Sequence, residues 1–236
     1  FAQLNYMRRQ SLGVRTDRIL VVKFPSPTEG MKIKMEAMRK AIRKLPLVSK
    51  VTCSGSVPGE EVAMFLSNRR THDALKQNRL YEMLSCDPDY MDAYGLELVA
   101  GRGFSEDYGD DVNKLVINET AARTLGYTDY ESVIGEEISV ETIEEPMQVI
   151  GVVKDYHQQA LNRNYTPIML FHKDKIDWIP QRYISIVMKP GDSLELVSQI
   201  SEIWTTYFAD SSFDYFFLDQ FYDRQYRQDE AFGVLM

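Results

Sequence analysis

The sequence predicts an α+β fold in which two β-α-β units flank a longer, mostly β segment. Three observations support this class. An apolar β-branched run, an amphipathic segment and a second such run follow one another within residues 18–56. The same order returns within residues 182–218. Between them, roughly from 60 to 175, short β-branched runs are frequent and helix-like segments are few.

The first unit begins with the run RILVVKF at 18–24, which is typical of a buried strand. Along 31–45, apolar residues recur every three or four positions, as on the buried face of a helix: Met31, Met35, Met38, Ile42 and Leu45. We expect the other face to be solvated, since it carries Lys32, Lys34, Arg39, Lys40, Arg43 and Lys44. A second strand lies within 47–59; if the two strands were parallel neighbours, their connection would be right-handed.

The middle segment reads as strands joined by turns and two short helices. RLYEMLSC at 79–86 predicts a strand, and Asp87-Pro88 then predicts a helix with proline at its first position. A turn follows at 101–103, and 114–127 predicts a strand and a helix that Gly126 ends. Three further strands are expected at 135–141, 147–153 and 166–172.

The second unit repeats the first. A strand is expected at 183–189, a helix at 193–208 with Asp192 or Ser193 as its N-cap, and a closing strand at 213–219. Helices are expected at both ends of the chain, over 1–12 and after the closing strand. The helix after the closing strand is expected to leave the domain.

The composition excludes several classes. A net charge of -8 and a pI of about 5.0 argue against a nucleic-acid partner. The chain contains no apolar run of about 18 residues and no signal peptide. It begins at Phe1 and stops at the apolar FGVLM, so we expect an excised fragment whose missing targeting signal says nothing about compartment.

No cofactor or metal is expected. Cys53 and Cys86 form no CxxC motif and have no histidine near them in sequence. We expect two free, partly buried thiols, although the sequence leaves a bridge between them open. The three histidines are far apart in sequence, and the acidic run SEDYGDD at 105–111 lacks the spacing of a calcium loop.

The stretch around Asp155 and His157 allows two interpretations. Asp155 and His157 follow the buried run 147–153 and could be a base and its orienting group. However, the chain contains no nucleophile motif. We therefore favour a strand end at which Gly151 loosens the strand and Asp155 caps the turn ahead of it. We predict no catalytic residue and expect the domain not to be an enzyme.

Several segments in this order resemble the MacB-type periplasmic core domain of FtsX-like ABC transporter permeases, in the version common in Bacteroidetes. The segments are VTCSGSVPG, CDPDYMDAYGLELVAGRGF, KLVINETAARTLGY, VIGVVKDYHQQALNRNYTPIMLF and DYFFLDQFYDRQYRQDEAFGVLM. No single motif is decisive, but the ordered series covers nearly the whole chain.

The resemblance implies a division of the chain. It predicts a discontinuous Porter-like subdomain at 15–57 and 180–218, made of the two β-α-β halves, and a mostly β Sabre-like insert at 58–179. The ends, 1–14 and 219–236, would be helical extensions toward transmembrane helices 1 and 2. The domain would lie on the periplasmic side of the bacterial inner membrane.

The resemblance also implies a mechanical function. The domain would relay ATP-driven helix motion to a periplasmic substrate or partner. Its partners would be its own transmembrane helices and the inner membrane, a cytoplasmic ABC ATPase, and a second permease copy or sibling. A periplasmic adaptor, or a lipoprotein, peptide or drug substrate, would be a further partner. Candidate hinge or turn residues are Gly55, Pro58, Gly59, Gly151 and Asp155.

Two alternatives remain open at this stage. The domain could instead be an extracytoplasmic binding or sensor domain that captures a peptide or lipid between two lobes. The other alternative, an extracytoplasmic hydrolase, is disfavoured because no activated nucleophile can be assembled from the sequence.

Overall fold

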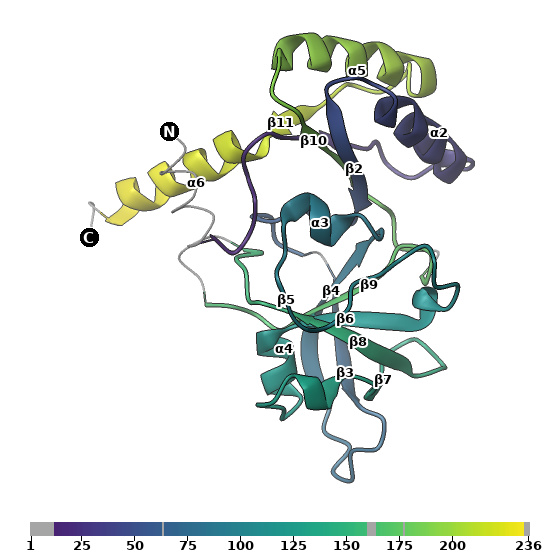
Figure 1. Ribbon diagram of the computed structural model, residues 1–236, viewed down its shortest axis with the longest axis vertical. Coiled ribbons are helices and arrows are strands. Elements are labelled where there is room, and N and C mark those ends of the chain that lie inside the picture. Colours follow the sequence, from purple (N-terminus) through teal and green to yellow (C-terminus); the bar gives the residue numbers. More distant parts are fainter. Residues whose placement is uncertain (1–11, 63, 160–163, 177, 234–236) are drawn as a thin grey trace.

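The computed structural model describes residues 12–62, 64–159, 164–176 and 178–233. Two lobes follow one another along the longest axis of the molecule, and helix α6 projects from the side where they meet (Figure 1). All strands of these residues belong to one eleven-stranded sheet, ordered β11-β1-β10-β2-β4-β3-β7-β8-β6-β9, with β5 paired to β8. The mixed α+β class predicted from the sequence is confirmed.

The first lobe, here called the four-stranded lobe, contains the strands of both predicted β-α-β units. Each of its neighbouring strand pairs is antiparallel. Its elements are β1 (Ile19–Lys23), α2 (Met31–Arg43), β2 (Val48–Ser54), β10 (Tyr183–Met188), α5 (Ser193–Tyr207) and β11 (Tyr215–Phe217).

The two units interleave instead of standing side by side. β10 lies between β1 and β2, and β1 lies between β11 and β10. The two strands of one unit are therefore not neighbours in the sheet, because each crossover helix passes over one strand of the other unit. This is the split β-α-β arrangement, in which each half completes the sheet of the other.

Helices α2 and α5 cover one face of the four-stranded lobe (Figure 1). The predicted apolar face of α2 is buried as expected, with Leu45 partly buried at its end. Asp192 is the N-cap of α5, where its carboxylate accepts from the N–H groups of Leu194 at 2.9 Å and Glu195 at 3.3 Å. The expectation of a fully solvated basic face on α2 is wrong for Arg39, which is buried.

The second lobe, here called the ring lobe, is built from six strands that close on themselves. The order β4-β3-β7-β8-β6-β9 returns from β9 to β4 by a parallel pairing. The strands are β3 (Phe65–Arg70), β4 (Arg79–Cys86), β6 (Lys114–Asn118), β7 (Glu137–Ser139), β8 (Met147–Val153) and β9 (Ile168–His172). Strand β5 (Leu98–Gly101) pairs with β8 in addition to this ring.

Short helices connect these strands. The predicted helix after β4 is α3 (Tyr90–Tyr94), which begins after Asp89 and not at Pro88. Helix α4 (Glu119–Thr124) follows β6 and is followed by Gly126 with a positive φ, as predicted. Two 3-10 turns lie at Asp111–Asn113 and Glu131–Val133.

Three apolar cores result. One lies under α2 and α5, and one is formed within the ring lobe with α4. The third joins the lobes, because it contains Ile19 of β1, Leu84 of β4, the tyrosines of α3 and Tyr222 of α6 (Leu218–Gly233). The helix predicted over 1–12 lies outside the described residues except for Leu12, which belongs to this joining core.

Candidate functional site

The root of α6 is built into the joining core. The helix starts directly after β11, and Leu218 and Tyr222 are both buried. The Tyr222 hydroxyl donates to the carbonyl oxygen of His157 at 3.1 Å. These contacts fix the first turns of the helix to the segment that follows β8.

The predicted turn at 55–59 lies against the same helix. Gly59 has φ +90°, and a Cβ added there would come within 2.9 Å of the Tyr222 ring, so this position requires glycine. The Gly59 N–H donates to the carbonyl of Gln158 and its carbonyl accepts from Nε2 of Gln225, both at 2.9 Å. Pro58 is buried, and the Gly55 N–H donates to the carbonyl of Ser85 at 2.8 Å.

A buried amide holds this turn from its other side. Nε2 of Gln158 donates to the carbonyls of Val57 at 2.8 Å and Glu60 at 3.0 Å. The Glu60 carboxylate in turn accepts from the hydroxyl of Tyr183 on β10. Sequence reasoning missed Gln158 and Tyr222, because neither residue stands in a recognisable motif. The arrangement joins α6, the 55–60 turn and the four-stranded lobe in one network, which we call the α6 anchor.

Asp155 and His157 serve separate purposes. The Asp155 carboxylate accepts from the backbone N–H and the hydroxyl of Thr120, both at 2.8 Å, and pairs with Arg123 at 2.5 Å. It therefore caps the start of α4, and the expectation that it caps the turn ahead of it is wrong. His157 packs against Tyr165 in a tilted arrangement with 4.7 Å between ring centroids, and burial lowers the pKa of His157. The stretch is thus a strand end tied to neighbouring elements.

Gly151 marks a bulge in β8. Leu115 of β6 pairs with Val149 of β8, so regular pairing would place the next residue, Val116, opposite Ile150. The register shifts instead, and Val116 pairs with Gly151. A Cβ added at Gly151 would lie 2.1 Å from the carbonyl oxygen of Arg102. The glycine therefore permits a close backbone approach, which is a more specific role than the expected loosening of the strand.

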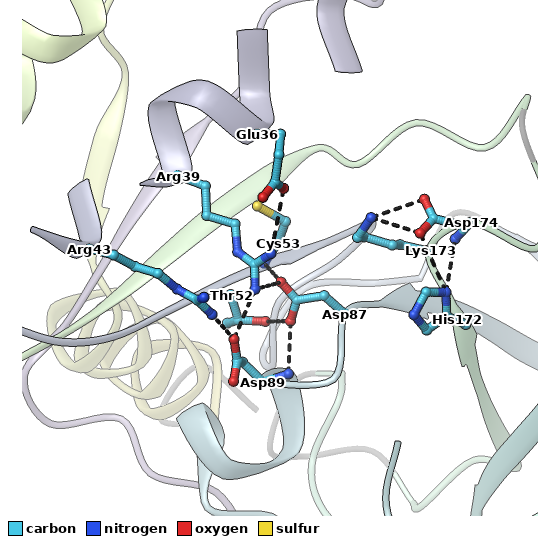
Figure 2. Close-up of polar contacts among 10 residues, drawn as sticks. All are labelled: Glu36, Arg39, Arg43, Thr52, Cys53, Asp87, Asp89, His172, Lys173 and Asp174. Carbon is cyan, nitrogen blue, oxygen red and sulfur yellow. Dashed lines mark hydrogen bonds and ion pairs between the residues drawn. The ribbon is translucent and has the colours of Figure 1, made fainter. Parts of the chain in front are cut away.

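A second network surrounds the buried Arg39 of α2 (Figure 2). Its guanidinium donates to Asp89 at 2.8 Å and lies 3.4 Å from the Asp87 carboxylate. Asp87 also accepts from the Thr52 hydroxyl at 2.5 Å and from the Cys53 N–H at 2.8 Å. The network therefore connects α2 and β2 of the four-stranded lobe to the residues that follow β4.

Burial and the hydrogen-bonding and charged partners of Asp87 shift the pKa of its carboxyl in opposite directions. Burial raises the pKa of its carboxyl, while Arg39, the Thr52 hydroxyl and the Cys53 N–H act to lower it. Burial also raises the pKa values of Cys53 and Cys86. The thiols are free and buried in different apolar cores.

The described residues were also compared with two kinds of feature, a metal site and a membrane-spanning helix. No group of three or more histidine, cysteine, aspartate or glutamate side chains gathers into a metal site within the described residues. In the same part of the chain, no helix combines the length and the apolarity that crossing a membrane requires.

Comparisons with known proteins identify a class of transporter domain. Residues 3–202 match the family described as MacB-like periplasmic core domain, so the chain belongs to this family. It is a periplasmic domain of a MacB/FtsX-like ABC transporter permease, as its sequence resemblance implied. No match is found among curated proteins.

Solved structures share the fold. The periplasmic region of MacB from Actinobacillus actinomycetemcomitans has a TM-score of 0.60 at 16% identity, covering 92% of this chain and 94% of its own. A domain of a protein described as a permease from Porphyromonas gingivalis has a TM-score of 0.58 at 20% identity, covering 85% of this chain and 89% of its own. The extracellular domain of the noncanonic ABC-type transporter YknZ from Gram-positive bacteria has a TM-score of 0.57 at 16% identity, covering 83% of this chain and 97% of its own.

Proposed function

We propose that the domain relays ATP-driven motion of transmembrane helices into the periplasm, where the motion acts on a substrate or partner. The α6 anchor carries this proposal. Tyr222 is 4% exposed and sits in the core that joins the two lobes. A helix held in this way transmits displacement into the domain, because moving its root requires breaking buried contacts.

The contacts of α6 reach residues far apart in sequence. Tyr222 bonds to His157, while Gln225 bonds to Gly59. Motion of the helix would therefore load the 55–60 turn and the end of β8 together. Rigid elements with discrete contacts of this kind are what couple distant parts of a protein.

The division of the chain follows from this mechanism. We propose 15–57 and 180–218 as the Porter-like subdomain and 58–179 as the Sabre-like insert, with 1–14 and 219–236 leading toward the membrane. Gly55, Pro58 and Gly59 would form the outgoing joint, and the segment 171–182 the return. Gly151 and Asp155 brace the insert, because their contacts lie within the ring lobe and α4.

The partners follow from the same proposal. They are the domain's own transmembrane helices in the inner membrane, a cytoplasmic ABC ATPase and a second permease copy or sibling. A periplasmic adaptor, or a lipoprotein, peptide or drug substrate, would receive the motion. ATP hydrolysis would take place in the ATPase, so the domain itself would not be an enzyme.

The relay can be tested in the full-length permease with its ATPase. Spin labels at Arg224→Cys on α6 and Leu75→Cys beyond β3, both exposed positions, report the distance between helix and insert. The distance should change on nucleotide trapping in the parent protein. Tyr222→Ala should abolish the change while ATP hydrolysis continues, and Tyr215→Ala, at an exposed site on β11, should not.

Two results would refute the relay: an unchanged distance in the parent protein, or a full distance change in a folded Tyr222→Ala variant. Because this substitution removes a buried ring, Tyr222→Leu serves as a second variant that retains most of the packing. It should give an intermediate change in distance.

A second candidate function, capture of a ligand by the extracytoplasmic domain, is favoured by one observation. A cavity of about 620 Å³ opens beside α2, within the size range of small-molecule sites.

A further inference from the structure

The cavity beside α2 lies between residues 31–39 of this helix and the segments 173–174 and 178–181 that follow β9. Small-molecule sites are typically concave and mostly apolar, and a few polar groups orient the ligand. The chemistry of the lining therefore indicates what kind of molecule the cavity can hold.

Most of the lining surface is apolar. Met31 and Met35 of α2 are buried in the wall, and their unbranched side chains can adapt to the shape of a ligand. Ile33 and Trp178, which also belong to the lining, are 77% and 67% exposed. An apolar ligand in the cavity would cover part of this surface.

The charged residues of the lining already have partners. Glu36 accepts from Arg39 at 3.5 Å, and Lys173 pairs with Asp174 at 2.9 Å (Figure 2). Lys32 also has an interaction of its own. Among the described residues, the lining thus offers no unpaired charge to a ligand, which favours an uncharged molecule.

Arg39 marks the inner end of the cavity, because it belongs to the lining and is 4% exposed. Its terminal nitrogens lie beside the carboxylates of Glu36, Asp87 and Asp89, at 3.5, 3.4 and 2.8 Å (Figure 2). Its Nε is buried and has no hydrogen-bond partner among the described residues, which is costly for a donor. Because three carboxylates already face this cation, a neutral acceptor suits the Nε better than a fourth negative charge.

Gln181 provides an acceptor in the same lining. Its Nε2 donates to the hydroxyl of Ser85 on β4, which holds the side-chain amide in place. Its Oε1 is buried and, within the described part of the chain, is likewise without a partner. The cavity therefore has an unmatched donor at Arg39 and an unmatched acceptor at Gln181. A carboxamide complements both, since its carbonyl oxygen accepts and its N–H donates.

We propose that this cavity binds an uncharged apolar carboxamide, whose carbonyl oxygen accepts from Nε of Arg39 and whose N–H donates to Oε1 of Gln181. The apolar tail lies along Met31 and Met35 and reaches Trp178 at the mouth. The site rests on ligand capture, the second candidate function, and does not depend on the relay.

Octanamide and 2-nonanone form a matched pair of probes. The two molecules have the same shape and the same carbonyl group, but the ketone has a methyl group in place of the amide nitrogen. The ketone should bind the 236-residue chain at least about fivefold more weakly, because it leaves the Gln181 acceptor unpaired. Octanoate should also bind at least about fivefold more weakly than octanamide, because its charge meets three carboxylates.

Trp178 reports on binding directly. The only other tryptophan, Trp204, is 2% exposed and lies outside the cavity lining. Titration with octanamide should therefore give a saturable shift of tryptophan emission to shorter wavelength. The shift should vanish in Trp178→Phe, while calorimetry on this variant still detects binding.

Gln181→Met tests the acceptor. The preference for octanamide over 2-nonanone should fall to within about twofold in this variant. Gln199→Met is the matched control. Gln199 of α5 also has a bonded Nε2 and an Oε1 without a partner among the described residues, but it lies outside the lining. The control should keep the preference of the parent.

Arg39→Lys tests the donor. The lysine keeps a positive charge but has no Nε–H, so both probes should bind at least about threefold more weakly while their ratio stays the same. Thermal unfolding checks that the variant is folded. The comparison of the two probes on the parent chain needs no substitution, so the proposal is tested even without this variant.

The tail distinguishes two sources of an apolar carboxamide, a fatty amide and an apolar peptide. Acetyl-leucinamide carries the amide groups and the side chain of a peptide. Tighter binding of octanamide would identify the fatty amide as the source, and tighter binding of acetyl-leucinamide the peptide. Both outcomes support the carboxamide site.

Three results would overturn the proposal. The absence of saturable octanamide binding would remove ligand capture by this cavity as well. Equal affinity for octanamide and 2-nonanone would leave ligand capture in place but refute the carboxamide. An equal loss of preference in Gln181→Met and Gln199→Met would show that Gln181 is not the acceptor.

Discussion

Arg39→Met gives the sharpest test of how the two lobes are held together. The substitution keeps an aliphatic stem in α2 but removes the guanidinium beside Asp87. That carboxylate would stay buried with the Thr52 hydroxyl and the backbone N–H groups of Cys53 and Asp89 as its donors. It would lack the positive charge now 3.4 Å away.

The expected loss of stability follows from this burial. Removing one partner of a buried ion pair costs about 3–5 kcal/mol, because the remaining charge is uncompensated. For a chain of this size, such a loss lowers the midpoint of thermal unfolding by about 6–20 °C. Arg43→Met is the matched control. Arg43 pairs with Asp89 at an exposed site, so its loss should cost at most about 1 kcal/mol.

The pH dependence has a definite sign. Burial already raises the pKa of Asp87, and removing Arg39 removes a charge that lowers it. A carboxyl with a raised pKa in the folded state stabilises the fold below its unfolded pKa of about 4, and this stability is lost as pH rises. The deficit of Arg39→Met relative to the parent should therefore be larger at pH 7 than near pH 4.

Chemical unfolding at both pH values measures the deficit. Arg39→Met/Asp87→Asn should recover part of the stability, because the neutral amide needs no counter-charge. Two outcomes would refute the reasoning: a loss in Arg39→Met no larger than in Arg43→Met, or a double variant as unstable as the single one.

Three further predictions concern the turn, the thiols and the strand end. Gly59→Ala should lose about 1–3 kcal/mol in thermal unfolding, from a strained φ and a clash, whereas Gly109→Ala, whose Cβ meets nothing within 4 Å, should be close to neutral. Cys53 and Cys86 should both react with a thiol reagent only after unfolding; a disulfide in the native protein would contradict their separate cores. Asp155→Ala should lose about 1–3 kcal/mol but keep transport when folded; a folded variant without transport would restore a catalytic role.

Local patterns predicted the elements well, because periodicity reports burial directly. The apolar face of α2 and the cap at Asp192 follow from residues within a few positions of each other. Strand β3 was missed because its sequence FLSNRR contains polar residues, among them Asn68, which is buried. Nothing in that run distinguishes it from a loop until β4 and β7 pair with it.

The arrangement of elements was harder to predict, because it depends on contacts between distant residues. The interleaving of the two units and the closing pair between β4 and β9 leave no local signal. Arg39 illustrates the same limit at one residue. It lies in a basic helix that reads as solvated, and its burial follows from Asp87 and Asp89, which lie 48 and 50 positions away.

The closed ring has a consequence for how copies of the domain can meet. Six strands that pair in a circle leave no open edge of their own. Within the described residues, unpaired strand backbone lies on the outer sides of β11 and β5, which are three and four residues long, and along β2, which pairs with β4 only through Ser54 and Cys86. The short edges at β11 and β5 are poor templates for adding a strand. Two ring lobes that meet would therefore have to associate through side chains, because the closed ring offers no strand edge to a neighbour.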